Sequence, residues 1–217
     1  NKEKIGGQKM SKLKYGVYNG RTIKRILENS RLYFLTSFFI IGIIIGAVSI
    51  KSDSGGVTDS LRQVVESYTK LRAEQGIAAN FCNSFAINAL FSAAVIFLGF
   101  SLIGYPFIML TPIVKGMGIG MVSGYMYSVY KFIGLGYSLL IIYPGAVISV
   151  FAFILACSHS CEYSRNAYAK AIQGRGQFEK DETKLFAVRQ LIMLGVAAAG
   201  SLVDALFAAM FSGFFEL

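Results

Sequence analysis

The residues from Phe81 to Leu110 form a run of thirty amino acids without a charged side chain. Runs of this length and polarity are typical of helices that cross a lipid bilayer, because about 20 apolar residues span the hydrocarbon core. Only 15% of the 217 residues are charged, and 54% are apolar; soluble domains carry about 25% charge. The composition predicts an integral membrane protein without a second, soluble domain.

Four more apolar segments surround this run, and together they predict the fold class. We expect an all-α, polytopic membrane helical bundle with about five transmembrane helices. The expected spans are residues 32–50, 81–110, 115–130, 137–157 and 188–214. The first has nineteen residues and would cover about 28 Å, close to the hydrocarbon thickness. We assign residues 1–31 to a basic cytoplasmic segment and residues 32–214 to a single transmembrane domain.

Glycines recur every four residues in two of the spans. Spacing by four places them on one helical face, where the absent side chains let a neighbouring backbone approach closely. We predict helix-packing faces in the first and third spans, and two such faces would leave one for a homo-oligomer. The glycines are Gly42 and Gly46, and Gly116, Gly120 and Gly124.

Prolines lie inside two of the apolar runs. A proline removes a backbone donor and clashes with the preceding turn, so it kinks or breaks a helix. We predict helix breaks at Pro106 and Pro144, and we expect Pro112 to end the second span. A broken helix in a bundle either accommodates packing or forms the floor of a polar cavity.

An amphipathic helix is predicted between the first two spans, from Leu61 to about Gln75. Its apolar side includes Leu61, Val65 and Tyr68, while charged residues lie on another side. Such a helix lies in the membrane interface or caps the bundle. Its exposed face is either simply solvated or a docking face for a partner outside the cytoplasm.

Positive charges predict the topology. The segment from Asn1 to Arg31 contains nine Lys and Arg residues against two acids. With five spans and a cytoplasmic N-terminus, the inner segments, in which we place Lys115, carry most of the Lys and Arg residues, as the positive-inside rule requires. The basic segment either fixes this topology or also contacts anionic lipid.

Asp204 is the only carboxylate predicted to lie well inside a span. An acid in the membrane is costly unless it faces the bundle, a partner or water. Three interpretations remain open: a polar clamp between helices, a hydrated acid near the outer surface, or an ion-coupling site. Transport needs more polar groups at the midplane than this sequence shows.

No catalytic, metal or cofactor site is predicted. Cys157, His159 and Cys161 do not converge on a helix, because the histidine points about 200° away from Cys157. The glycine-rich stretch lacks the Lys-Ser/Thr ending and the preceding strand of a phosphate-binding loop. The sequence contains one histidine and no recognisable hydrolytic arrangement, so we expect no enzyme, and no nucleic-acid partner.

The order of these features resembles the stage II sporulation protein M family. The resemblance covers about residues 30–213 and rests on the basic tail, the amphipathic helix and a set of apolar and glycine positions. The family's Pro-His-Gly and glutamate positions differ here, and Asp204 replaces its usual terminal glutamate. The matching residues are Asn88-Ala89-Leu90 to Gly99, Lys115-Gly116 to Gly120, Tyr143-Pro144-Gly145 with Ala152 and Ala156, and Asp204 to Phe207.

The resemblance implies a non-enzymatic protein of the bacterial cytoplasmic membrane. It would recruit two cell-wall-degrading partners, stage II sporulation proteins P and D, during engulfment or cell-wall remodelling. The alternative is a small transporter or the membrane subunit of an ABC-type transport complex. A midplane cavity lined by Asp204 favours transport, whereas a solid core favours the scaffold.

Overall fold

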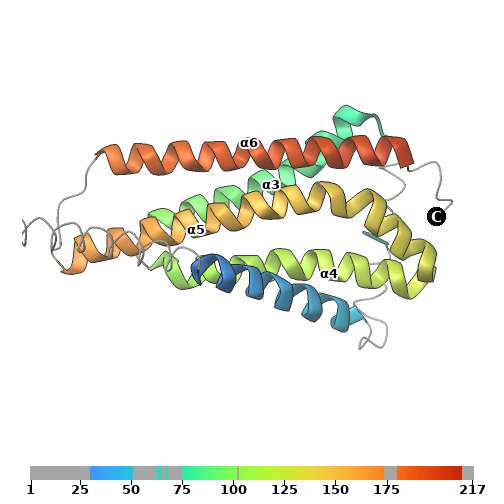
Figure 1. Ribbon diagram of the computed structural model, residues 1–217, viewed down its shortest axis with the longest axis horizontal. Coiled ribbons are helices and arrows are strands. Elements are labelled where there is room, and N and C mark those ends of the chain that lie inside the picture. Colours follow the sequence, from blue (N-terminus) through green and yellow to red (C-terminus); the bar gives the residue numbers. More distant parts are fainter. Residues whose placement is uncertain are drawn as a thin grey trace, which may run out of the picture. The chain divides into compact units, whose positions relative to one another are not determined.

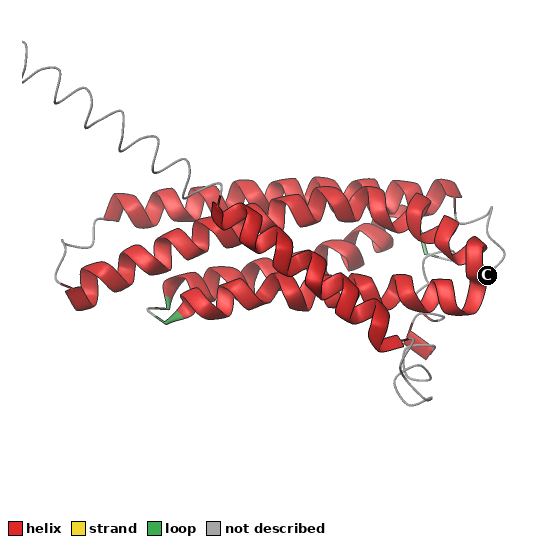
Figure 2. Ribbon diagram, turned by 60° about the horizontal axis from the view of Figure 1, so that its bottom comes forward, coloured by secondary structure: helices red, strands yellow, loops and turns green. Residues whose placement is uncertain are grey.

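The computed structural model describes residues 30–50, 63, 64, 67, 75–101, 103–173 and 180–211. The chain divides into two compact units, residues 1–34 and 35–217. The fold described below belongs to the second unit. Within the described residues every regular element is a helix and none is a strand (Figure 2).

Four helices among the described residues are long and apolar enough to cross a membrane: Ser30–Ile50, Ile77–Phe100, Gly104–Ala171 and Asp181–Phe211. The prediction of about five separate spans therefore differs from the structure. The predicted third and fourth spans lie within one continuous helical segment of 68 residues. That segment consists of α4 (Gly104–Tyr137), the π-helix η1 (Ser138–Ile142) and α5 (Tyr143–Gln173). The remaining labelled helices are α3 (Ile77–Phe100) and α6 (Lys180–Phe211).

The long segment folds back on itself, so that α4 and α5 lie side by side in opposite directions (Figure 1). The turn occurs at Lys131, whose φ of 54° and ψ of −128° are not helical. Partner numbers on α5 fall as those on α4 rise, as expected for antiparallel helices. The contacting pairs are Thr111 with Cys157, Lys115 with Phe153, and Ser123 with Tyr143.

The break between α3 and α4 precedes the one we predicted at Pro106. Helix α3 ends at Phe100, and α4 begins at Gly104. Only glycine fits at position 104, because a Cβ there would overlap the carbonyl of Leu98. Pro106 instead lies in the first turn of α4, where a backbone N–H has no helical acceptor and its loss costs little.

Pro112 does not end a span, contrary to our prediction, but lies buried inside α4. A proline leaves the carbonyl four residues earlier without its usual donor. The hydroxyl of Thr111 donates to that carbonyl, the one of Ile108, over 2.8 Å. The hydroxyl of Thr111 thus replaces the donor that Pro112 lacks, and the helix continues.

Pro144 follows a π-helical turn at the start of α5. The backbone N–H of Tyr143 donates to the carbonyl of Ser138, five residues earlier. A π-turn inserts an extra residue into a helix. The helix therefore continues through Pro144 with altered spacing, so the break that we predicted at Pro144 within the span 137–157 is a π-turn inside a continuous helix.

The regularly spaced glycines of the first helix, Ser30–Ile50, pack against the backbone of α4, and those of α4 pack against the first helix. A Cβ at Gly42 or Gly46 would overlap the backbone of Ile113 or Met117 on α4, and partner numbers rise together, so the helices are parallel. From the other side, Gly116, Gly120 and Gly124 lie against the backbones of Phe39, Ile43 and Ala47. The two faces form one internal interface, which removes the argument that one of them remains for self-association.

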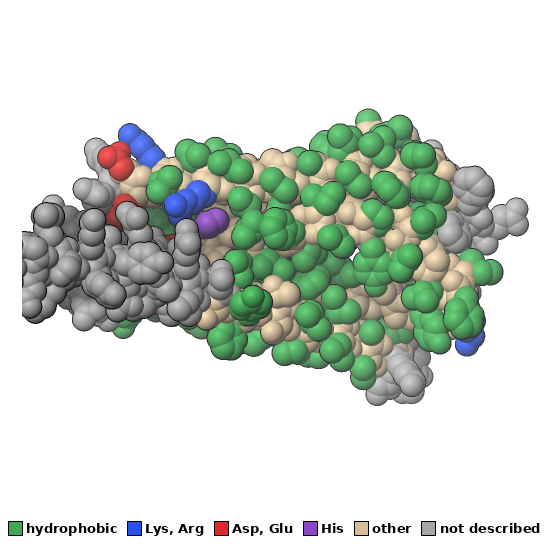
Figure 3. Space-filling view, viewed as in Figure 1, with side chains coloured by type: hydrophobic (Ala, Val, Ile, Leu, Met, Phe, Trp, Pro, Cys, Tyr) green, Lys and Arg blue, Asp and Glu red, His purple; other side chains and the backbone are tan. Residues whose placement is uncertain are grey.

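Large apolar side chains cover the outside of the described helices. Figure 3 shows hydrophobic side chains over the middle of the visible face and charged ones near its ends. Phe97 is 78% exposed, Phe132 80% and Leu90 71%. Soluble proteins rarely expose contiguous apolar surface on this scale, so the surface fits a lipid environment.

Candidate functional site

Asp204 lies on α6 where this helix meets α3 and α5. Its carboxylate accepts a hydrogen bond of 2.5 Å from the hydroxyl of Ser84 on α3. On the α5 side it packs against Gly145, where a Cβ would overlap the Cβ of Asp204. The acid therefore contacts two neighbouring helices, at a position where α5 has no side chain.

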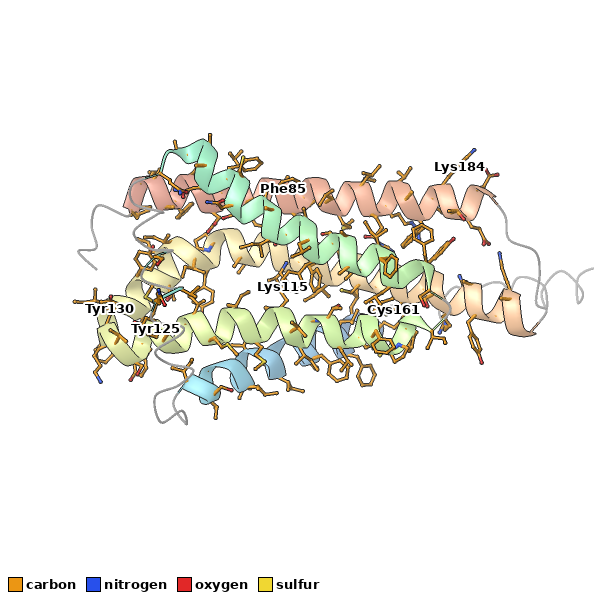
Figure 4. The ribbon with its side chains drawn as sticks, turned by 180° about the vertical axis from the view of Figure 1, so that it is seen from behind. Phe85, Lys115, Tyr125, Tyr130, Cys161 and Lys184 are labelled. Atoms are coloured by element: carbon orange, nitrogen blue, oxygen red, sulfur yellow. The ribbon has the colours of Figure 1, made fainter. Side chains whose placement is uncertain are left out.

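Lys115 is the residue whose position the sequence analysis missed. We placed it in a cytoplasmic segment between two spans, but it lies inside α4, about 16 Å from the start of that helix at 1.5 Å per residue. Its side chain is 8% exposed and lies between α3, α4 and α5 (Figure 4). The expectation was wrong because Pro112, just before it, does not end the helix.

The ammonium group of Lys115 is held by an amide and two aromatic rings. Its Nζ donates to Asn88 Oδ1 over 2.9 Å. It also lies 4.4 Å from the ring centroid of Phe153 and 5.4 Å from that of Phe91. A cation over an aromatic face is attracted by roughly 2 kcal/mol when desolvated, which offsets part of the cost of burying the charge.

Asn88 connects four helices. From α3, its amide accepts from Lys115 on α4 and donates to Ser149 on α5 over 3.3 Å and to Ser201 on α6 over 3.0 Å. Ser201 in turn donates to the carbonyl of Ala197 over 3.0 Å. We call Ser84, Asn88, Lys115, Ser149, Ser201 and Asp204 the polar cluster.

A cavity of about 220 Å³ adjoins the polar cluster, and all six members line it. The rest of its lining comes mainly from apolar residues such as Ile87, Phe91 and Val150, together with Gly118. A water molecule occupies about 30 Å³ in the liquid, so the cavity accommodates more than one. The described part of the bundle is therefore not solid around Asp204.

The residues considered for a metal lie elsewhere on α5. Cys157 and Cys161 are buried, and Cys157 contacts the hydroxyl of Thr111 at 3.5 Å. Among the described residues, no group of three or more His, Cys, Asp and Glu side chains is arranged to hold a metal ion. Cys157 therefore takes part in the packing between α4 and α5.

The predicted docking residues Leu61, Val65 and Tyr68 lie outside the described residues. The same holds for the basic segment before Ser30. Of the predicted amphipathic helix the structure describes residues 63, 64 and 67, which are helical and exposed, and Gln75. These do not include the predicted docking residues, so the docking face stays a prediction.

A family model described as stage II sporulation protein M matches residues 35–215, which include all four helices of the polar cluster. The chain belongs to the stage II sporulation protein M family. A search of curated proteins and a search of solved structures found no match. The polar cluster thus lies within the part of the chain that defines its membership of the stage II sporulation protein M family.

Proposed function

We propose that this chain is a non-enzymatic membrane scaffold for cell-wall remodelling. Membership of the stage II sporulation protein M family carries this proposal, because the match includes nearly all the described residues. In the proposed role the chain holds peptidoglycan-degrading enzymes at the outer face of the bacterial cytoplasmic membrane. Its proposed partners there are stage II sporulation proteins P and D, during engulfment.

The packing of the bundle supports such a role. The first helix and α4 meet along glycines, and Asn88 joins α3 to three other helices. Close backbone contact and interhelical hydrogen bonds are the interactions that hold helices together in lipid. A bundle fixed in this way presents its outer segments at constant positions, which a docking platform needs.

The proposed topology has five passes and a cytoplasmic N-terminus. The segment Gly104–Ala171 doubles back, so it supplies two of the passes. The parallel arrangement of the first helix and α4 agrees with this, since both would run outwards. Moving Lys115 out of the inner count leaves the excess of Lys and Arg on the same side, as the positive-inside rule requires.

Photocrosslinking in native membranes tests the scaffold. A photoreactive residue replaces Tyr68 on the predicted docking helix, and a matched control replaces Leu191, which is 67% exposed on α6. The proposal predicts capture of a peptidoglycan hydrolase from position 68 but not from position 191. Capture at position 68 of only a second copy, or of an ATPase, would contradict it.

Transport is the second candidate, and one observation favours it. Lys115 and Asp204 both line the cavity, and charged residues inside a membrane often mark ion pathways. In reconstituted vesicles a transporter would carry ions or solute, and Asp204→Asn would abolish the flux. If wild-type vesicles show no flux, and the Asp204→Asn variant still captures a hydrolase in the photocrosslinking experiment, the scaffold is favoured.

A further inference from the structure

The cavity beside the polar cluster opens on the side of the helical bundle. Two of its lining residues, Ile87 and Val114, are 51% and 59% exposed. Both lie on helices that are apolar enough to cross a membrane, so in the proposed topology this opening faces the hydrocarbon. A molecule with an apolar body therefore has a direct route from the bilayer to the polar end of the cavity.

Lys115 supplies hydrogen-bond donors at that polar end. An ammonium group has three N–H donors. In the structure the ammonium of Lys115 donates to one acceptor, Asn88 Oδ1. The side chain is more than nine-tenths buried and lines the cavity. Its remaining donors are available to an anionic group in the cavity.

Asp204 places the opposite charge in the same cavity. Its carboxylate accepts from Ser84, and the residue lines the cavity. Ser84 and Asn88, which bond to the acid and to the ammonium, are four residues apart on one face of α3. The two ends of the cavity thus suit groups of opposite sign.

We propose that this cavity binds the zwitterionic headgroup of an aminophospholipid, with its phosphate at Lys115 and its ammonium at Asp204. The lining carries one charge of each sign, so a ligand without net charge adds no excess charge to a membrane interior, where such charge is costly. A purely anionic headgroup satisfies Lys115 but brings a second negative charge close to Asp204. The proposal goes beyond the scaffold and does not depend on it.

Two glycines allow a matched test. Gly118 lines the cavity, Gly195 on α6 does not, and a Cβ at either position meets no atom within 4 Å. Gly118→Leu therefore adds a side chain at the cavity lining without forcing helices apart, and Gly195→Leu adds the same side chain elsewhere. Both variants are expected to fold, which thermal unfolding in detergent checks.

The full chain, purified in detergent, is incubated with phosphatidylethanolamine, phosphatidylglycerol or free phosphoethanolamine at equal concentration, and native mass spectrometry measures retention. The wild type and Gly195→Leu should retain phosphatidylethanolamine, and Gly118→Leu about tenfold less. Equal retention by Gly118→Leu, or equal retention of phosphatidylglycerol by the wild type, would overturn the proposal. Retention of free phosphoethanolamine at the level of the lipid would show a soluble ligand and overturn the lipid source.

Discussion

At the scale of single residues, the polar cluster depends on one amide. Asn88 both accepts from a buried cation and donates to two serines, functions that neither a carboxylate nor an aliphatic side chain combines. A buried polar group that loses its partner pays its full desolvation cost. Position 88 therefore affects the stability of the bundle more than a single hydrogen bond would.

Asn88→Leu is expected to lower the free energy of unfolding by roughly 1–3 kcal/mol, because it leaves Lys115 without its acceptor. Unfolding in detergent by increasing denaturant measures the change. The control is Asn83→Leu on the same helix, where the exposed amide donates to Gln75. Similar losses in the two variants would show that the bond to Lys115 contributes little.

The sequence allowed part of the polar cluster to be predicted. Asp204 stands out as a lone acid in an apolar run, and burial costs mark such a residue. Ser84 and Asn88 carry a weaker signal, four residues apart on one face of a charge-free helix. Lys115 carried none, since its position inside α4 depends on Thr111 satisfying the carbonyl that Pro112 leaves.

At the scale of helices, the stepped glycines determine which pair packs most closely. Gly116 and Gly120 lie against the backbone of the first helix, whereas Gly118, between them, faces open space. The same substitution should therefore disturb packing at Gly116 or Gly120 and leave it nearly unchanged at Gly118.

Gly120→Leu is expected to destabilise the bundle by roughly 1–3 kcal/mol, because the new side chain collides with the backbone of Ile43 and overpacked interfaces cost about that much. Gly118→Leu is the control and should leave thermal unfolding in detergent nearly unchanged. Comparable losses at both positions would mean that helix propensity or insertion, rather than the interface, determines the effect.

The bend between α4 and α5 contains a strained residue. Lys131 adopts a φ of 54°, which costs an L-residue about 1–2 kcal/mol and a glycine almost nothing. Lys131→Gly should raise the free energy of unfolding by up to about 1 kcal/mol. Lys131→Ala removes the same charge but keeps the strain, so it should show no gain; a gain from alanine as large as from glycine would contradict this account.

Helix boundaries were harder to predict from sequence than helix existence. Each predicted span contains helix, but the break after Phe100 precedes Pro106, and the π-turn before Pro144 keeps the helix continuous. A proline can stay inside a continuous helix where another donor satisfies its orphaned carbonyl, as Thr111 does for Pro112. That condition depends on side-chain geometry, which a sequence pattern does not contain.

At the scale of the whole molecule, the account depends on the long segment crossing twice. If Gly104–Ala171 doubles back within the bilayer, Lys115 and Asp204 both lie inside the membrane part and their cavity opens to lipid. The composition alone predicted a membrane bundle of helices, and the antiparallel contacts between α4 and α5 add the fold-back.

Cysteine labelling of cells tests this most directly. In a chain whose native Cys82, Cys157 and Cys161 are replaced by alanine, single cysteines are introduced by Lys131→Cys at the bend and Lys184→Cys near the start of α6. The account predicts that a membrane-impermeant maleimide labels position 131 in intact spheroplasts and position 184 only after permeabilisation. Labelling of both positions from the same side, or no labelling at position 131 before permeabilisation, would contradict the two crossings.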